Sequence, residues 1–185
     1  GEARRQKLWA DAVRIVREVG YEGAGTVEFV ASPDGELFFL EVNARLQVEH
    51  CVTEMVTGID LVEQQIKVAL GEKLAPEILS PKRSGHSIEA RVYAEDPAKK
   101  FAPQPGHIAT LRWPAGAADL RIETGVQEGG EVTPFYDPMI AKVAAWAETR
   151  ADCIARLDEA LAGTSLELTG PQGNRAGTNL AFLRA

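Results

Sequence analysis

Cysteine is scarce in this sequence, and long apolar runs are missing from it. The 185 residues include only two cysteines, Cys51 and Cys153. Neither belongs to a short-spaced cysteine or histidine pair of the kind that binds zinc, and one pair cannot build the disulfide framework of a small secreted domain. No apolar run approaches the roughly 20 residues that a helix needs to span a bilayer. We therefore expect neither a zinc module nor a membrane protein, and we predict a reducing, cytoplasmic setting.

Basic residues are also in deficit. The chain has 20 Lys and Arg against 27 Asp and Glu, which gives a formal net charge of -7. Nucleic-acid-binding domains usually present a basic surface, so nucleic acid is not an expected partner. The rest of the composition is ordinary for a globular protein with a real core. The chain starts inside a helical pattern and without Met, and we interpret it as part of a longer protein.

Hydrophobic periodicity predicts an α+β chain whose first part mixes helices with strands and whose remainder is rich in strands. Residues 76–84 are polar and contain proline, and we place a boundary there, with predicted domains of residues 1–80 and 81–185. Residues 163–178, rich in glycine and other turn formers, are predicted to be a loop. Helices are predicted over residues 3–19, 60–70 and 150–162 and from residue 179, and strands over residues 25–32, 36–43, 88–93, 107–112, 120–124 and 139–146.

A predicted hairpin brings two carboxylates together. The Asp34-Gly35 pair lies between two strand-like runs, and Asp-Gly is a strong signal for a two-residue hairpin turn. Such a turn places Pro33 opposite Glu36, and the same register then places Glu28 directly opposite Glu41. Opposed side chains share a face, and two like charges there destabilise the sheet unless a positive group lies between them. A magnesium ion is one such group, because it prefers oxygen ligands.

Further polar side chains follow on the same strand face. In an extended segment alternate residues project to one side, so the residues after Glu41 continue the polar surface. Two interpretations remain open from spacing alone: a metal or charged-substrate site, and a solvated sheet face of the ordinary kind. The residues concerned are Asn43, Arg45, Gln47 and Glu49.

Five blocks of the sequence resemble the biotin carboxylases, which are ATP-grasp enzymes that carboxylate biotin with MgATP and bicarbonate. The resemblance implies the C-terminal half of an ATP-grasp domain, an antiparallel sheet with helices, followed by a β-rich biotin carboxylase C-terminal domain. It covers nearly the whole chain in order. The blocks are residues 25–29, residues 39–50 with the run Arg45-Leu46-Gln47-Val48-Glu49-His50, and residues 52–58, 85–97 and 134–142.

The resemblance implies a metal and nucleotide role for the hairpin residues. Glu28 and Glu41 would hold magnesium, or manganese, against the phosphates of ATP, with Asn43 supporting the metal and the phosphates. This agrees with the independent argument from the hairpin register. Phosphoryl transfer depends mainly on positioning and on neutralising charge, and a metal ion and arginines supply both.

The resemblance also implies substrate-binding and catalytic roles. Gln47, Arg45 and the backbone at Val48 would bind bicarbonate, with Arg45 also stabilising charge on biotin. Glu49 would be the general base that deprotonates bicarbonate, so that it attacks the γ-phosphate and forms carboxyphosphate. Arg91 would bind the ureido oxygen of biotin and stabilise its enolate. A planar guanidinium suits both bicarbonate and the ureido group because it donates two parallel hydrogen bonds.

The implied partners are a biotin carboxyl carrier domain, a carboxyltransferase and a second copy of the protein. Lysines and a glycine-rich lid that contact ATP in the family lie outside this sequence, so we expect the 185 residues alone to be inactive. Cys51 stands where most acyl-CoA carboxylases have proline. At Cys51, and also at residues 123–125 and 132–134, the sequence resembles the urea carboxylases more closely than the acyl-CoA carboxylases.

Two other interpretations compete with the biotin carboxylase one. The first is a different ATP-grasp ligase, such as a carbamoyl-phosphate or purine-synthesis enzyme, because those share paired metal carboxylates. The second is a non-catalytic assembly module. Glu54 and Lys142 are interpreted as structural residues, and Glu54 is expected to stabilise the start of a helix. Residues 168–177 look like an insertion near the adenine pocket of the family.

Overall fold

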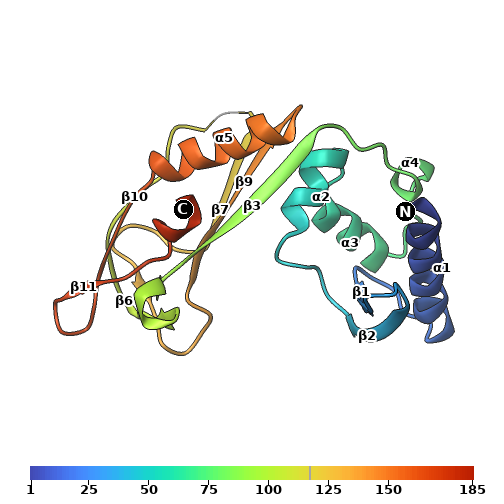
Figure 1. Cartoon of the computed structure of the whole chain (residues 1–185), viewed down its shortest axis with the longest axis horizontal. Helices are drawn as coiled ribbons and strands as arrows, with labels where there is room; N and C mark the ends of the chain where they lie inside the picture. Colours follow the sequence, from blue (N-terminus) through green and yellow to red (C-terminus); the bar gives the residue numbers. More distant parts are fainter. Residues whose placement is uncertain (117) are drawn as a thin grey trace. The chain divides into compact units, whose positions relative to one another are not determined.

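The computed structural model describes residues 1–116 and 118–185 and divides the chain into two compact units (Figure 1). The first unit contains Gly1–His50 and Gly58–Pro81. The second unit contains Cys51–Thr57 and Lys82–Ala185. No helix in the described part of the chain is long and apolar enough to cross a membrane.

The first unit combines helices with one hairpin. Helix α1 spans Glu2–Glu18, strands β1 and β2 span Thr26–Ala31 and Leu37–Asn43, and helices α3 and α4 span Leu61–Ala69 and Pro76–Leu79. The predicted helix and strands appear within one or two residues of their expected ends. The short α4 lies in the segment predicted to be a connection. It begins at proline, whose fixed φ suits the first turn of a helix.

Helix α3 begins as its sequence predicts. The Asp60 side chain accepts a hydrogen bond from the backbone N–H of Glu63, at 2.8 Å. This bond satisfies one of the backbone donors that the first turn of any helix leaves without a partner. The helix ends before Gly71, whose φ of 82° is one that glycine adopts readily.

The turn between β1 and β2 is longer than predicted, and a bulge compensates. Ser32 N donates to Glu36 O at 2.9 Å, so the loop contains three residues rather than two. The strands then pair with one register until Phe29, where a shift leaves Leu40 as an extra residue on β2. Beyond the bulge Glu28 lies opposite Glu41. The predicted turn is therefore wrong, whereas the predicted pairing of the two carboxylates is confirmed.

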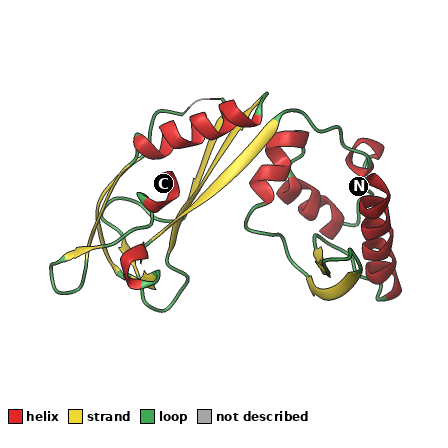
Figure 2. Cartoon of the chain, viewed as in Figure 1, coloured by secondary structure: helices red, strands yellow, loops and turns green. Residues whose placement is uncertain are grey.

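The second unit is built mainly from strands (Figure 2). Its three-stranded antiparallel sheet has the order β3-β9-β7, with β3 at His86–Tyr93, β9 at Met139–Ala147 and β7 at Leu120–Thr124. Helix α5, Arg150–Ala162, packs on one face of this sheet. The α+β class predicted from the sequence is confirmed.

A four-stranded sheet of order β11-β10-β6-β8 corrects the predicted loop at residues 163–178. Ser165–Thr169 forms β10, in which Leu166 and Leu168 alternate with exposed or half-buried polar residues, and Arg175–Ala176 forms β11. Turn formers surround this alternation and hide it, because they dominate the composition of the segment. The partners are β6, Gly106–Arg112, and β8, Glu131–Val132.

Short elements complete the second unit. Strand β4, Glu95–Asp96, pairs with β5, Ala102–Pro103, around the 3-10 turn η1, Pro97–Lys99. The predicted final helix is only the 3-10 turn η2, Phe182–Arg184.

Two different layers cover the faces of the three-stranded sheet. On one face Ala90, Val143 and Ala145 belong to the apolar core that α5 completes with Cys153 and Leu157. The residues between them point to the opposite face, because side chains alternate along a strand.

That opposite face receives helix α2, His50–Thr57, which was not predicted. Ser84 N donates to Val56 O at 2.8 Å, and Ser87 Oγ donates to Met55 Sδ at 3.6 Å. These contacts explain why Cys51–Thr57 belongs to the second unit.

Candidate active site

The end of the hairpin in the first unit gathers two carboxylates around one amide. Asn43 Nδ2 donates to Glu28 Oε1 at 2.7 Å and to Glu41 Oε1 at 3.3 Å. Glu28 comes from β1, whereas Glu41 and Asn43 come from β2, two residues apart and therefore on the same face. The positive end of an N–H bond thus lies between two like charges that the register brings together.

This arrangement fits a divalent cation. Both carboxylates direct an oxygen at one point, which the Asn43 nitrogen occupies. Magnesium is commonly bound by one or two carboxylates with further oxygen ligands from substrate phosphates. Glu41 is exposed and Glu28 is half-buried, so a nucleotide-bound ion could reach both without unfolding the hairpin.

A hydrogen-bonded series continues from Asn43 along the chain. Arg45 Nη2 donates to Asn43 Oδ1 at 3.1 Å, and Arg45 Nη1 donates to Gln47 Oε1 at 3.1 Å and to Leu46 O at 3.2 Å. The chain does not continue as a strand beyond Asn43, because it bends at Arg45. The expected alternation therefore stops there, and the guanidinium is what keeps Gln47 beside the hairpin residues.

Val48 and Glu49 form a turn immediately before α2. The side chain of Glu49 is exposed. His50 starts the helix, with its Nδ1 atom 2.8 Å from Gln47 O. The turn thus connects the hairpin residues to the first turn of a helix, where backbone N–H groups favour negative charge.

Arg91 lies on β3 in the second unit. Its Nε atom is 3.7 Å from Glu89 Oε1, and the Glu89 side chain is only 4% exposed. Across the sheet Arg91 is directly opposite Lys142. The Arg91 side chain is 38% exposed, so its guanidinium group is accessible to a ligand.

Asn179 is a residue that sequence reasoning did not select. It is buried, its Oδ1 accepts from Tyr93 N at 2.8 Å, and its Nδ2 donates to Arg91 O at 3.0 Å. Its own backbone N–H donates to Tyr93 O at 3.1 Å. Asn179 therefore pairs with the β3 backbone on both sides of Val92, as a neighbouring strand would. A single polar residue in a loop carries no periodic signal for such a role.

A partly buried group of charges, which we call the ion cluster, lies where α2 meets the three-stranded sheet of the second unit. Lys142 Nζ lies 2.7 Å from Glu123 Oε2 and donates to Cys51 Sγ at 3.2 Å. Arg121 contacts both Glu54 and Glu123, with its Nε atom 2.7 Å from Glu123 Oε1. Glu54 and Lys142 are 6% and 8% exposed. The interpretation of Glu54 as a residue of helix entry is wrong, because its side chain is buried against Arg121.

The ion cluster shifts the pKa values of its members. Burial alone would raise the pKa of Glu123, but hydrogen bonds from Lys142 and Arg121 outweigh burial and lower the pKa to about 2. Burial alone would lower the pKa of Lys142, but its bonds to Glu123 and Cys51 outweigh burial and raise this pKa. Burial raises the pKa of the Cys51 thiol. At neutral pH Glu123 is thus a carboxylate, Lys142 an ammonium and Cys51 a thiol.

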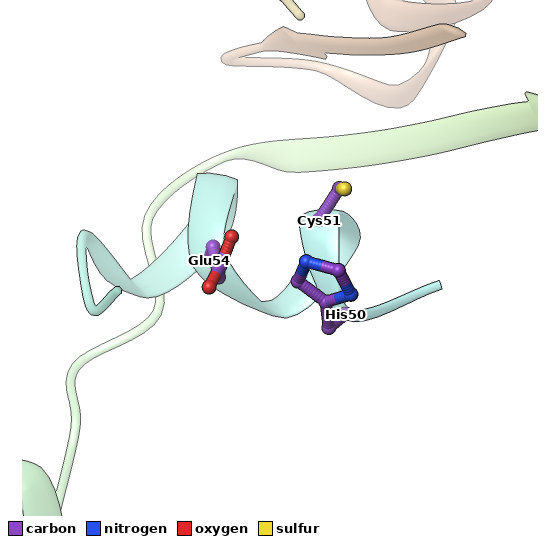
Figure 3. A group of neighbouring side chains, drawn as sticks. All are labelled: His50, Cys51 and Glu54. Carbon is purple, nitrogen blue, oxygen red and sulfur yellow. The ribbon is translucent and has the colours of Figure 1, made fainter. Parts of the chain in front are cut away.

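Helix α2 also carries a group of potential metal ligands, His50, Cys51 and Glu54, whose ligand atoms lie within 4.8 Å of one another (Figure 3). Two of the three already contact fixed positive charges, because Glu54 binds Arg121 and Cys51 binds Lys142. A divalent cation would be repelled by both. We therefore assign no metal to this group.

Comparison with known families identifies both parts of the sequence. Residues 89–185 match the family described as the biotin carboxylase C-terminal domain. Residues 1–77 match the family described as the carbamoyl-phosphate synthase L chain, ATP binding domain.

Individual relatives agree with these families. The methylcrotonoyl-CoA carboxylase subunit alpha of Dictyostelium discoideum is 46% identical over 183 residues, which cover 99% of this chain and 25% of that protein. Biotin carboxylase 2 of Bacillus subtilis is 46% identical over 157 residues, which cover 85% of this chain and 35% of that protein. The chain therefore corresponds to a part of these longer proteins.

Solved structures have the same fold. The biotin carboxylase domain dimer of Hydrogenobacter thermophilus 2-oxoglutarate carboxylase, in complex with MgADP, ADP and bicarbonate, gives a TM-score of 0.87 at 38% identity, over 100% of this chain and 39% of that one. The urea carboxylase of Kluyveromyces lactis gives a TM-score of 0.85 at 40% identity, over 100% of this chain and 16% of that one.

Proposed function

Because this chain belongs to the biotin carboxylase family, we propose that it supplies part of the active site for MgATP-dependent carboxylation of biotin by bicarbonate. The observation that carries the proposal is the convergence of Glu28 and Glu41 on Asn43, which continues through Arg45 to Gln47. The proposed metal site and the proposed bicarbonate site thus adjoin each other on one stretch of chain. Phosphorylation of bicarbonate needs both, because ATP arrives with its metal and bicarbonate must lie in line with the γ-phosphate.

The hairpin carboxylates are the proposed metal ligands. Glu28 and Glu41 would hold the magnesium or manganese ion that accompanies ATP, with Asn43 beside it. The bound ion would neutralise phosphate charge. Before the ion binds, the Asn43 amide separates the two carboxylates, so the site keeps its shape without a large electrostatic cost.

Arg45, Gln47 and the backbone of Val48 are the proposed bicarbonate ligands. Arg45 has a planar guanidinium that can donate two parallel bonds to a carboxylate-like face. Its present acceptors, Asn43 Oδ1 and Gln47 Oε1, are neutral oxygens, which an anion would replace favourably. Glu49, exposed in the turn that follows these residues, would accept the proton of bicarbonate as the general base.

Arg91 is the proposed ligand of the biotin ureido oxygen. Removing a proton from the ureido nitrogen places negative charge on that oxygen, and a guanidinium stabilises it. Carboxyphosphate would then deliver carbon dioxide to the activated nitrogen. The Asn179 bonds to the backbone at Arg91 and Tyr93 support this role by fixing the strand that carries the guanidinium.

The metal site can be tested on the 185 residues themselves. Manganese(II) broadens the NMR signals of nearby nuclei, so adding it should erase the backbone signals of residues 26–43 first. Glu41→Gln should abolish this selective loss, whereas Glu36→Gln, an exposed carboxylate near the turn of the same hairpin, should preserve it. Broadening that is the same in all three proteins would contradict the metal assignment.

The catalytic assignment needs the parts that the longer relatives contain. We would place this chain in the Dictyostelium discoideum relative, in exchange for the matching 183 residues, and measure bicarbonate-dependent release of ADP with free biotin. Turnover should be stimulated by biotin. Glu49→Gln should lower it by about 100-fold or more, as loss of a general base does, and Glu36→Gln should not. Equal turnover in the Glu49→Gln protein would reject Glu49 as the base.

One observation favours a second candidate, another ATP-grasp ligase. Residues 1–77 match the ATP binding domain of carbamoyl-phosphate synthase. Such an enzyme would cleave ATP with bicarbonate at a rate that is indifferent to biotin. Biotin dependence of ADP release in the same exchange protein therefore discriminates between the two candidates.

The expected partners are a biotin carrier domain and a carboxyltransferase, together with a second copy of the protein. The names of the relatives support this part of the proposal, because they include carboxylase subunits and a domain dimer. The identity of the final carboxyl acceptor is left open. A methylcrotonoyl-CoA carboxylase at 46% identity and a urea carboxylase at 40% are similarly close to this chain.

A further inference from the structure

The ion cluster contains a thiol and an amine in direct contact. Lys142 Nζ lies 3.2 Å from Cys51 Sγ, although the two residues are 91 positions apart in the sequence. Cys51 is completely buried and Lys142 is 8% exposed. This contact uses neither the hairpin residues nor Arg91, so the proposed carboxylation does not account for it.

The surroundings fix the pair in place. Cys51 lies in the first turn of α2, and Lys142 lies in the middle of β9, the central strand of its sheet. Glu123 Oε2 is 2.7 Å from Lys142 Nζ and holds the nitrogen in position beside the sulfur. The ammonium must lose a proton to solvent before its nitrogen can react. Arg121 holds the Glu123 carboxylate from its other side.

The second cysteine offers a contrast within the same unit. Cys153 lies on α5, which covers the opposite face of the sheet, so the two cysteines cannot form a disulfide with each other. The Cys153 sulfur donates to the backbone oxygen of Ala145 at 3.2 Å. It is therefore an internal control, a buried thiol bonded to a carbonyl instead of an amine.

We propose that Cys51 and Lys142 form a covalent bridge through one oxygen atom, Cys51 Sγ–O–Nζ Lys142, when the protein is exposed to dioxygen. The thiol and the neutral amine each lose one hydrogen, and one molecule of dioxygen is consumed. One oxygen atom forms the new S–O and O–N bonds, and the other leaves as water with the two hydrogens. Sulfur and nitrogen each give up two electrons, and dioxygen accepts all four.

An inserted oxygen suits the geometry better than a direct bond between sulfur and nitrogen. The atoms lie at hydrogen-bond distance, and a direct bond would require a much larger approach of α2 to β9. A thiol reductant should reverse the bridge. Four equivalents of thiol return the cysteine and the lysine, and they yield one water and two disulfides. The modification is therefore expected to be reversible, unlike the higher acids of cysteine.

Peptide mass spectrometry of the 185-residue chain, incubated in air and digested without reductant, tests the bridge. Trypsin does not cut after a modified lysine, so residues 46–67 should be joined to residues 122–150. The joined mass should exceed the sum of its two peptides by one oxygen less two hydrogens. Met55 and Met139 lie in these peptides, but their oxidation adds a whole oxygen and joins nothing.

The controls separate the bridge from other oxidation. Cys51→Ser and Lys142→Arg should each abolish the joined peptide, whereas Cys153→Ser should leave it unchanged. Dithiothreitol should release the two peptides. The proposal is overturned if the air-exposed wild-type protein yields only separate peptides, with Cys51 free or converted to an acid. A joined peptide without the extra oxygen also overturns it. Because wild-type protein alone decides these outcomes, a variant that fails to fold cannot obscure them.

A bridge should also change stability. It would close a loop of 91 residues, which restricts the unfolded chain as a disulfide does. The thermal midpoint of air-oxidised protein should therefore rise by several degrees above that of reduced protein. In Cys51→Ser the two midpoints should coincide. These measurements do not depend on ATP, biotin or bicarbonate, so their failure would leave the proposed carboxylation untouched.

Discussion

The hairpin site and the ion cluster use the same kinds of side chain for opposite purposes. At the hairpin, Glu41 is exposed, and a neutral amide separates it from Glu28. In the cluster, Glu54 and Glu123 meet the charges of Arg121 and Lys142 in a largely buried place. Carboxylates left without a countercharge remain available to an incoming cation. Carboxylates neutralised by fixed cations contribute instead to the folded structure, and removing one of them leaves a buried charge.

The largest expected difference is in stability. Glu123→Gln should lower the free energy of unfolding by about 2–3 kcal/mol, since it removes the carboxylate shared by Lys142 and Arg121. The value is below the full cost of breaking a buried pair because the Glu123 side chain is 33% exposed. Glu41→Gln should change stability by less than about 0.5 kcal/mol, or raise it, because it relieves a like-charge pair. Urea denaturation of both variants measures the difference. Equal losses would erase the contrast between the two regions.

A smaller loss of stability is expected when Asn179, an uncharged residue that hydrogen-bonds to the backbone of β3, is replaced. Asn179→Ala would leave Tyr93 N–H and Arg91 C=O without their side-chain partner, at a cost of about 2 kcal/mol. Asn174→Ala is the matched control, because Asn174 is exposed and, among the described residues, its side chain makes only a 3.4 Å bond to Arg175 O. In the exchange protein, Asn179→Ala should also raise the KM for biotin more than that for ATP. Equal changes in the two KM values would indicate a purely structural role.

The pH dependence of stability sharpens the same comparison. The folded pKa of Glu123 is about 2, below its ordinary value of 4.5. A carboxyl group with a lowered folded pKa stabilises the protein above its unfolded pKa and loses that contribution as the pH falls through the folded value. Stability should therefore decline between pH 4.5 and about 2, and less steeply in Glu123→Gln. Parallel pH profiles of the two proteins, followed by thermal unfolding, would contradict this assignment.

The smallest expected effects concern the two arginines. Arg121→Lys should cost about 1 kcal/mol, because one ammonium cannot reach both Glu54 and Glu123 as a planar guanidinium does. Arg45→Lys should cost less than about 0.5 kcal/mol, since the Arg45 side chain is exposed and its acceptors are neutral. Thermal unfolding compares the two. A larger loss for Arg45→Lys would mean that the hairpin site, too, depends on its arginine for folding.

Local sequence determined the elements that carry a clear periodic signal. Helix α5 and strands β3 and β9 appear where their apolar patterns place them, and α3 begins at its capping Asp60. Strand β10 was missed because its alternation is short and turn formers surround it. The Glu28–Glu41 pairing was predicted from a turn of the wrong length, and the bulge at Leu40 restored the expected register.

The sequence by itself determined the family and the α+β class, because these depend on patterns along the chain. Only the tertiary structure decided the ion cluster and the role of Asn179. Cys51 and Lys142 are 91 positions apart, and Asn179 is 86 from Tyr93. Their contacts exist because α2, β3 and β9 pack together, and no local pattern encodes which distant charge will neutralise a buried one.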